Sequence, residues 1–203
     1  MTGESKLREM VAAHSRQTCF VSLKSEVGNG ARILSGSDDC SLRVCDMNEE
    51  EQEFIATMKP ITSLTVEASP SSSIVYAAMI SFAKDKVRKK SGNHKNPITT
   101  LKLQPDGGLL ASGDQDGNVS VWNVQRRLVL FFSTGSRIMD VTFSPLEPMI
   151  YVSSAAGAIR SYDFITQRLR IVQAPNCRSL ALSADGEDMY LSNEDGHIGL
   201  WSL

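Results

Sequence analysis

The three histidines of the chain are the side chains best suited to acid–base or metal chemistry near neutral pH. They are His14, His94 and His197, and none belongs to an HExxH or CxxC-like pattern that would place several ligands on one metal. The sequence also has no GxSxG motif, no GxxxxGK[ST] phosphate loop and no acidic cluster suited to calcium. We therefore predict a protein that is not an enzyme, with no cofactor and no metal site.

Cysteine chemistry is equally poorly supported. The four cysteines form no CxxC pair, which favours reduced thiols over a disulfide framework; they are Cys19, Cys40, Cys45 and Cys177. Cys40 and Cys45 lie close enough in sequence to suggest a metal or redox site. Because free cysteine is among the most buried residue types, we interpret them as packing residues instead.

Charged side chains concentrate in two segments. Residues 84–95 are strongly basic and could contact phosphate or an acidic partner, or act as a nuclear import patch. No aromatic residue interrupts this run, so stacking on single-stranded bases is not indicated. A solvated loop is the simpler interpretation, and the same holds for the acidic residues 48–53.

Composition is that of an ordinary globular chain. The 203 residues are 41% hydrophobic and 22% charged, with a formal net charge of -2. This charge gives no general attraction to nucleic acid or anionic membrane. No apolar run reaches the roughly 18 residues that a membrane span needs, and the N-terminus lacks an apolar signal core. We expect a cytoplasmic or nuclear protein with no membrane contact.

The elements that would position these residues repeat along the chain. Five similar short strands begin at a spacing of about 40 residues, the period of a four-stranded propeller blade; we predict them at 19–23, 61–66, 98–103, 138–143 and 177–182. Breaker-rich turns follow three of them, at 104–108, 144–148 and 183–187. A second hairpin then closes through Asp116-Gly117, Ala156-Gly157 or Asp195-Gly196.

The later strands of each unit follow the same plan. Third strands end on an aromatic side chain at Trp122, Tyr162 and Trp201, and fourth strands are predicted at 127–132 and 167–172. The pattern is a repeated β-meander without a helix of convincing length. The final unit stops after its third strand, and residues 6–12 could supply the missing fourth strand. The alternative is a disordered N-terminal tail.

These features resemble the WD-repeat β-propeller family, and the likeness covers residues 6 to 203. In that family a blade is often braced by hydrogen bonds among a histidine, a serine or threonine, a turn aspartate and a tryptophan. The resemblance assigns these roles to His94, Ser112, Asp116 and Trp122 in the third unit, to His14, Ser35 and Asp39 in the first, and to Ser192, Asp195 and Trp201 in the fifth. Because an unpaired buried carboxylate is costly, we expect the histidines to be braces, not ligands.

Two units depart from the family pattern. The fourth has Ala156 in place of the turn aspartate and Tyr162-Asp163 in place of the usual dipeptide, so we expect packing alone to hold it. The second, from Ile61 to about Gly92, lacks both the turn aspartate and the tryptophan, and its residues 79–90 have few turn signals. We expect a partial blade there.

The expected architecture is all-β, a single propeller domain of about five four-stranded antiparallel blades, either complete or open. The approximate repeats are 14–58, 59–93, 94–133, 134–173 and 174–203, the last closed by 6–12. Fewer repeats than the family's usual seven leave three alternatives: a small closed ring, a truncated product, or an arc that a partner completes. An open arc would leave strands available for pairing with another chain.

Such propellers are used as rigid discs whose loops present side chains to other proteins or peptides. On this basis the partner-binding residues are expected to be Arg16, Asp38, Lys95, Arg137 and His197. The predicted function is a non-enzymatic scaffold or adaptor subunit of an intracellular multiprotein complex. The alternative is a component of a ribonucleoprotein or nuclear complex that contacts nucleic acid through residues 84–95. The sequence does not predict an oligomeric state.

Overall fold

The structure, a computed structural model, describes residues 17–24, 31–46, 52–56, 60–69, 72–79, 94–123 and 127–203. Within these ranges every regular element is a β-strand, and all strand pairs are antiparallel. The prediction of an all-β fold built from antiparallel sheets is confirmed.

The described strands form five sheets in chain order. Sheet 1 contains β1 (Gln17–Lys24), β2 (Ala31–Ser37), β3 (Ser41–Asp46) and β4 (Gln52–Ala56). Sheet 2 contains β5 (Ile61–Ser69) and β6 (Ser72–Met79). Sheet 3 contains β7 (Ile98–Leu103), β8 (Leu109–Asp114), β9 (Asn118–Asn123) and β10 (Leu128–Ser133).

Sheet 4 contains β11 (Ile138–Phe143), β12 (Met149–Ser154), β13 (Ala158–Asp163) and β14 (Leu169–Gln173). Sheet 5 contains β15 (Cys177–Leu182), β16 (Asp188–Asn193) and β17 (Ile198–Ser202). The segment 6–12, expected to complete this sheet, lies outside the described residues, as does most of the region 79–90 expected to be irregular.

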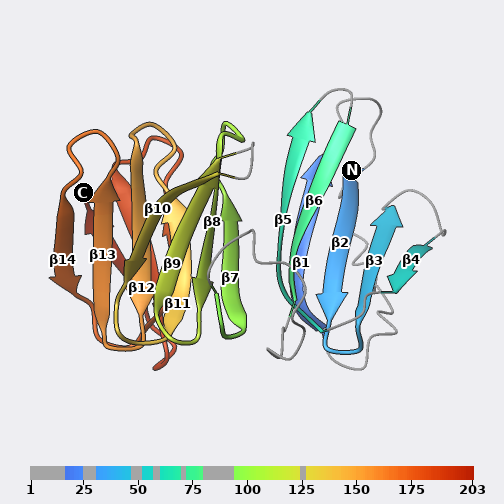
Figure 1. Cartoon of the computed structure of the whole chain (residues 1–203), viewed down its shortest axis with the longest axis horizontal. Helices are drawn as coiled ribbons and strands as arrows, with labels where there is room; N and C mark the ends of the chain where they lie inside the picture. The colour runs from blue at the N-terminus through green and yellow to red at the C-terminus, as the bar shows by residue number, and fades with distance from the viewer. Residues whose placement is uncertain are drawn as a thin grey trace, which may run out of the picture.

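The sheets stand side by side in the order of the chain. The first strand of each sheet packs against the first strand of the next, so that β1, β5, β7, β11 and β15 form one row. Sheet 1 and the orange and red strands of sheets 4 and 5 lie at opposite ends of the molecule (Figure 1). β1 and β15 form no extended contact with each other. The described sheets are therefore arranged as an open arc, consistent with an incomplete propeller of several blades.

Each first strand carries a register irregularity near its beginning. The shift falls between Gln17 and Cys19 in β1, and at the matching step in β5, β7, β11 and β15. Such a bulge bends the strand and increases its twist. The repetition of one irregularity in all five sheets shows that the sequence repeat is also a repeat of backbone geometry.

Side chains, not a backbone ladder, connect neighbouring first strands. Thr62 Oγ1 donates to the carbonyl of Ile98 at 2.7 Å, and Thr99 Oγ1 donates to the carbonyl of Ile138 at 2.7 Å. Leu101 N donates to Ser63 Oγ at 3.0 Å. These bonds satisfy polar groups that packing between sheets would otherwise leave unpaired.

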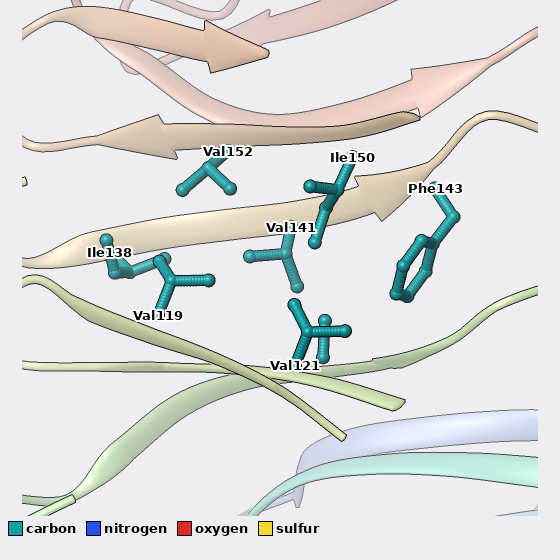
Figure 2. Packing of buried hydrophobic residues seen from close by; sticks show 8 residues of the cluster. Val119, Val121, Ile138, Val141, Phe143, Ile150 and Val152 are labelled. Atoms are coloured by element: carbon teal, nitrogen blue, oxygen red, sulfur yellow. The ribbon is translucent and has the colours of Figure 1, made fainter. Parts of the chain in front are cut away.

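The apolar core lies between sheets. Between sheets 3 and 4, the fully buried side chains are β-branched or small and alternate along their strands, as expected for half-buried strands; they include Ala111, Val119, Val121, Ile138, Val141, Ile150 and Val152 (Figure 2). A second cluster between sheets 4 and 5 contains Tyr151, Ile159, Leu180, Met189 and Leu191. Each interface joins the second and third strands of one sheet to the first and second strands of the next.

The second hairpin turn of sheets 1, 3, 4 and 5 contains a residue in the left-handed conformation. Gly117 has φ 89°, and a Cβ there would lie 2.4 Å from the carbonyl oxygen of Ser136 in the following unit. Cys40 occupies the matching position in sheet 1 with φ 64°. Glycine is therefore needed at 117 for two reasons, its φ and the close approach of the next unit.

Candidate functional site

Two ends of the sheets can be distinguished by connectivity. We call the end where each first strand begins the leading end; the turn between second and third strands lies there too, because the strands are antiparallel. The remaining turns, between first and second strands and between third and fourth strands, lie at the opposite, trailing end. Four of the predicted partner-binding residues lie at the leading end, and Arg16 lies outside the described residues.

Backbone hydrogen bonds fix the leading end in the same way in three sheets. The amide of Gln115, in the second turn of sheet 3, donates to the carbonyl of Pro97 just before β7 at 3.1 Å. The equivalent bonds join Ala155 to Arg137 in sheet 4 and Glu194 to Asn176 in sheet 5. Each turn is thus attached to the segment that leads into its own first strand, so side chains carried by these loops are held on a rigid base.

Asparagine side chains add a second attachment. Asn96 Nδ2 donates to Asp116 Oδ2, and Asn176 Nδ2 donates to Asp195 Oδ2 at 3.3 Å. Both aspartates are exposed turn residues, placed immediately before a turn glycine. Each of these turn aspartates is therefore hydrogen-bonded, at the protein surface, to the segment before the first strand of its own sheet.

The inner brace of sheet 3 uses a different carboxylate from the one predicted. His94 Nδ1 donates to Asp114 Oδ2 at 2.7 Å, and its Nε2 lies 2.8 Å from Ser112 Oγ. Trp122 Nε1 donates to the same Ser112 hydroxyl at 3.4 Å. The assignment of Asp116 to this brace was wrong, since the aspartate beside His94 is Asp114.

The correction has a simple physical reason. Ser112 and Asp114 are two residues apart on β8 and so lie on the same face of the strand, where His94 can contact both. Asp116 lies beyond the strand end, in the exposed turn. The two-residue spacing of Ser112 and Asp114 could have indicated the brace from the sequence. The assignment instead followed the Asp116-Gly117 dipeptide, which is typical of a turn.

Asp114 is completely buried, and its carboxylate is extensively hydrogen-bonded. The amides of Asp116 and Asn118 donate to Oδ1 at 3.0 and 2.8 Å, and Asn118 Nδ2 donates to Oδ2 at 3.0 Å. Burial alone would raise the pKa of Asp114, but the hydrogen bonds from His94 and Asn118 outweigh it and leave the pKa below its ordinary value. The carboxylate is thus a charged structural group.

Sheet 4 has a brace that the sequence interpretation missed. Arg160 Nη1 donates to Ser154 Oγ at 3.1 Å, and its Nη2 donates to the carbonyl of Thr134 at 3.3 Å. Ser154 stands three residues before the turn glycine, as Asp114 does in sheet 3. We expected packing alone to hold this unit. Instead, an arginine on the third strand reaches the segment before the first strand.

The remaining predicted brace residues are only partly described. His14 lies outside the described residues, Ser35 is buried in β2, and Asp39 is an exposed turn residue whose Oδ1 accepts a hydrogen bond from Ser41 Oγ at 2.5 Å. In sheet 5, Ser192 is half-buried on β16 and Trp201 packs against the cluster between sheets 4 and 5. The brace roles in sheets 1 and 5 stay predictions.

The predicted partner-binding residues share the leading end but differ in exposure. Lys95, Arg137 and His197 are exposed, whereas Asp38 is half-buried. Lys95 also lines an open hollow with His94, Asp116, Asn118 and the exposed Phe131. The sequence interpretation did not find the ion pair between Arg178 Nη2 and Glu194 Oε1, 3.0 Å apart at the leading end of sheet 5. Both residues are exposed loop or strand-end charges with no motif to mark them.

The chemistry of the described residues is consistent with binding. No group of three or more His, Cys, Asp or Glu side chains in the described ranges is arranged to hold a metal ion. Burial raises the pKa of the Cys177 thiol, which disfavours the reactive thiolate. The described part of the chain contains no helix that is long and apolar enough to cross a membrane.

Comparison with known proteins agrees with the geometry of sheet 3. Residues 84–123 match the family described as "WD domain, G-beta repeat", and this range contains His94, Ser112, Asp114 and Trp122. This stretch of the chain is similar to a WD repeat. The match ends at the last residue of β9, so the braced part of sheet 3 is also the part with the clearest family pattern.

Two curated relatives extend this likeness beyond residues 84–123. It is 29% identical over 129 residues to "Small ribosomal subunit protein RACK1y" of Oryza sativa subsp. japonica, over 58% of this chain and 38% of the relative. It is 25% identical over 134 residues to "Cross-pathway control WD-repeat protein 2" of Flammulina velutipes, over 60% of this chain and 42% of the relative. The chain therefore matches about two fifths of the length of each relative.

Proposed function

We propose that this protein is a non-enzymatic scaffold or adaptor subunit that binds other proteins or peptides at the leading end of its sheets, within a cytoplasmic or nuclear complex. The observation that carries the proposal is the repeated attachment of each second turn to the segment before the first strand in sheets 3, 4 and 5. Exposed side chains on loops held in this way can bind a partner with little loss of loop entropy.

Two exposed basic side chains at this end suit a partner that carries acidic groups. Lys95 and Arg137 are exposed and belong to consecutive units. Arginine and lysine both donate charge-assisted hydrogen bonds to carboxylates and phosphates, and arginine can do so with two parallel bonds. The relatives are named as a ribosomal subunit protein and as a WD-repeat protein, which supports membership of an assembly without identifying one.

Affinity purification of the full chain followed by mass spectrometry tests the proposal. We expect Lys95→Glu with Arg137→Glu to lose one set of co-purifying proteins. The matched control is Arg127→Glu with Arg168→Glu, which reverses two exposed charges at the trailing end and should retain that set. An unchanged protein list in the first variant would refute the choice of surface.

Nucleic acid contact through residues 84–95 stays the alternative prediction, because only His94 and Lys95 of this segment lie within the described residues. The same purification distinguishes it. Loss of partners after nuclease treatment, or after neutralising Lys86, Arg88, Lys89 and Lys90, would favour nucleic acid. Retention of the partners under both conditions would favour direct protein binding.

A further inference from the structure

One face of sheet 5 exposes side chains at positions that, apart from the half-buried Ser161, are buried in sheets 3 and 4. Counting from the turn glycines Gly117, Gly157 and Gly196, the strand pairing makes three sets of positions equivalent; these are Ala111, Tyr151 and Tyr190, then Val119, Ile159 and Ile198, then Val121, Ser161 and Leu200. Ala111, Val119 and Val121 are all 0% exposed. Tyr190, Ile198 and Leu200 are 43%, 80% and 59% exposed.

The burial of the equivalent residues has one cause. In sheets 3 and 4 this face packs against the first and second strands of the next sheet, with Val119 and Val121 beside Ile138 and Val141 (Figure 2). In sheet 5 the opposite face packs toward sheet 4, through Leu180, Met189 and Leu191. The outer face of sheet 5 is therefore an inter-sheet surface that continues the two established interfaces but has no sheet against it among the described residues.

The centre of this outer face is free of charged side chains. Two rows cross the centre, Ser179–Ser192–Ile198 and Ala181–Tyr190–Leu200, and the next row carries Asp188, whose Oδ1 accepts a hydrogen bond from Ser202 Oγ at 3.2 Å. The hydroxyl of Ser179 already donates to Asp140 Oδ2 at 2.6 Å, so burying Ser179 leaves its hydroxyl hydrogen paired. Interface centres are depleted in charge and enriched in tyrosine.

Each row is also complementary in side-chain size to the same row of a second copy. Each has a small residue on β15 and a large one on β17. If a second sheet 5 lies face to face with the first, related by a two-fold axis parallel to the strands, β17 of one copy lies over β15 of the other. The large Ile198 and Leu200 of each copy then lie above the small Ser179 and Ala181 of its partner.

We propose that the outer face of β15–β17 is a self-association surface, and that a second copy of this chain packs its own β15–β17 face against it in a two-fold pair. Such isologous pairing uses the same patch on both copies. Three strands of about five residues cover roughly 250 Å². That footprint is small beside the ~800 Å² per partner of a stable complex, so the pair should be weak and dependent on concentration.

Sedimentation of the full chain over a range of concentrations tests the proposal. The wild type should move from the mass of one copy toward that of two as concentration rises. Ile198→Lys with Leu200→Lys should stay at one copy, because two charges would be desolvated at the centre of the pair. The control Leu146→Lys with Ile165→Lys, two similarly exposed apolar residues in trailing-end turns, should associate like the wild type.

A cross-linking experiment tests the face-to-face arrangement directly. Its result does not depend on whether the lysine variant folds. Face-to-face sheets pack about 10 Å apart, so cysteines facing each other across the pair are too far apart for a direct disulfide and need a bifunctional thiol cross-linker of about that length. Mixing Ala181→Cys with Leu200→Cys chains in the presence of such a cross-linker should give a mixed cross-linked dimer. Leu146→Cys mixed with Leu200→Cys should give only the background that the native cysteines of the wild type produce.

Three results would overturn the proposal. The first is a wild type that remains at one copy at every concentration. The second is association that persists in the Ile198 and Leu200 lysine variant while the mixed cross-linked dimer is absent. The third is a monomeric wild type that pairs only when Met10 and Val11 are changed to lysine, since the chain's own first residues would then be covering the face.

Discussion

Asp114 and Asp116 are two residues apart and have opposite surroundings. Asp114 is buried and receives hydrogen bonds from His94, Asn118 and the amide of Asp116. Asp116 is exposed and accepts one from Asn96. A buried charge that loses its hydrogen-bond partners costs several kcal/mol of stability, whereas an exposed charge is largely solvated by water. The two positions therefore differ in what they contribute to stability.

We expect Asp114→Ala to lower the free energy of unfolding by about 3 kcal/mol, because it leaves His94 and Asn118 without their acceptor. Asp116→Ala should cost less than about 1 kcal/mol. Urea unfolding of both variants at pH 7 measures the difference. Equal losses would show that the turn carboxylate contributes as much as the buried one.

The pH dependence of the Asp114 contribution follows from the direction of its pKa shift. The pKa of Asp114 is lower in the folded chain than its ordinary value, so its stabilisation is complete above the unfolded pKa of about 3.9 and is lost as the pH falls through the folded value. The unfolding free energies of wild type and Asp114→Asn should therefore converge below about pH 4. A gap that is constant from pH 7 to pH 3 would contradict this.

At the scale of the element, sheets 3 and 4 solve the same problem with different residues. In each sheet, the second or third strand must be attached to the segment that precedes the first strand of the same sheet. Sheet 3 does so through His94, Ser112 and Asp114, and sheet 4 through Arg160 and Ser154. The arginine reaches from β13 to the carbonyl of Thr134, in the segment before β11.

We expect Arg160→Met to lower the free energy of unfolding by about 1–2 kcal/mol, since two hydrogen bonds are lost while the aliphatic part of the side chain is retained. Arg170→Met is the matched control. It removes an exposed arginine from β14 and should change stability by less than about 0.5 kcal/mol. Similar losses in the two variants would argue that Arg160 acts only through its net charge.

The sequence predicts the sheets better than it predicts the brace. The first strands expected at 98–103, 138–143 and 177–182 have those bounds in the structure, because turn residues and alternating apolar residues mark strand ends locally. Arg160 could not be found this way. Its role depends on how β13 lies beside the segment that contains Thr134, which is a property of the assembled sheet. Likewise, no local signal separates the exposed Ile198 from the buried Val119.

At the scale of the whole molecule, Asp140 connects three sheets through one carboxylate. Thr100 Oγ1 of β7 donates to Oδ1 at 3.2 Å, and both Ser179 Oγ and the amide of Leu180 in β15 donate to Oδ2, at 2.6 and 2.9 Å. Asp140 itself belongs to β11. The arc from sheet 3 to sheet 5 thus depends partly on a single side chain in its middle.

We expect Asp140→Ala to increase the hydrogen exchange rate of the Leu180 amide by about tenfold or more, because that amide loses its acceptor. Asp163→Ala, which removes a carboxylate bonded only within its own turn to Ile165 and Thr166, should leave the Leu180 amide unchanged. Hydrogen exchange followed by mass spectrometry or NMR measures the protection of the Leu180 amide in both variants. Unchanged protection in the first variant would show that Asp140 does not hold β15.

The cross-links between neighbouring first strands have a mechanical consequence. Within a sheet, strands are joined by continuous main-chain ladders, whereas sheets are joined in the central row by single hydroxyls and one carboxylate. A pulling force applied to the two ends would load these isolated contacts one after another while each ladder shares its load among several bonds. The chain should therefore yield between sheets before any sheet unravels, and each yielding step would release an intact β-meander.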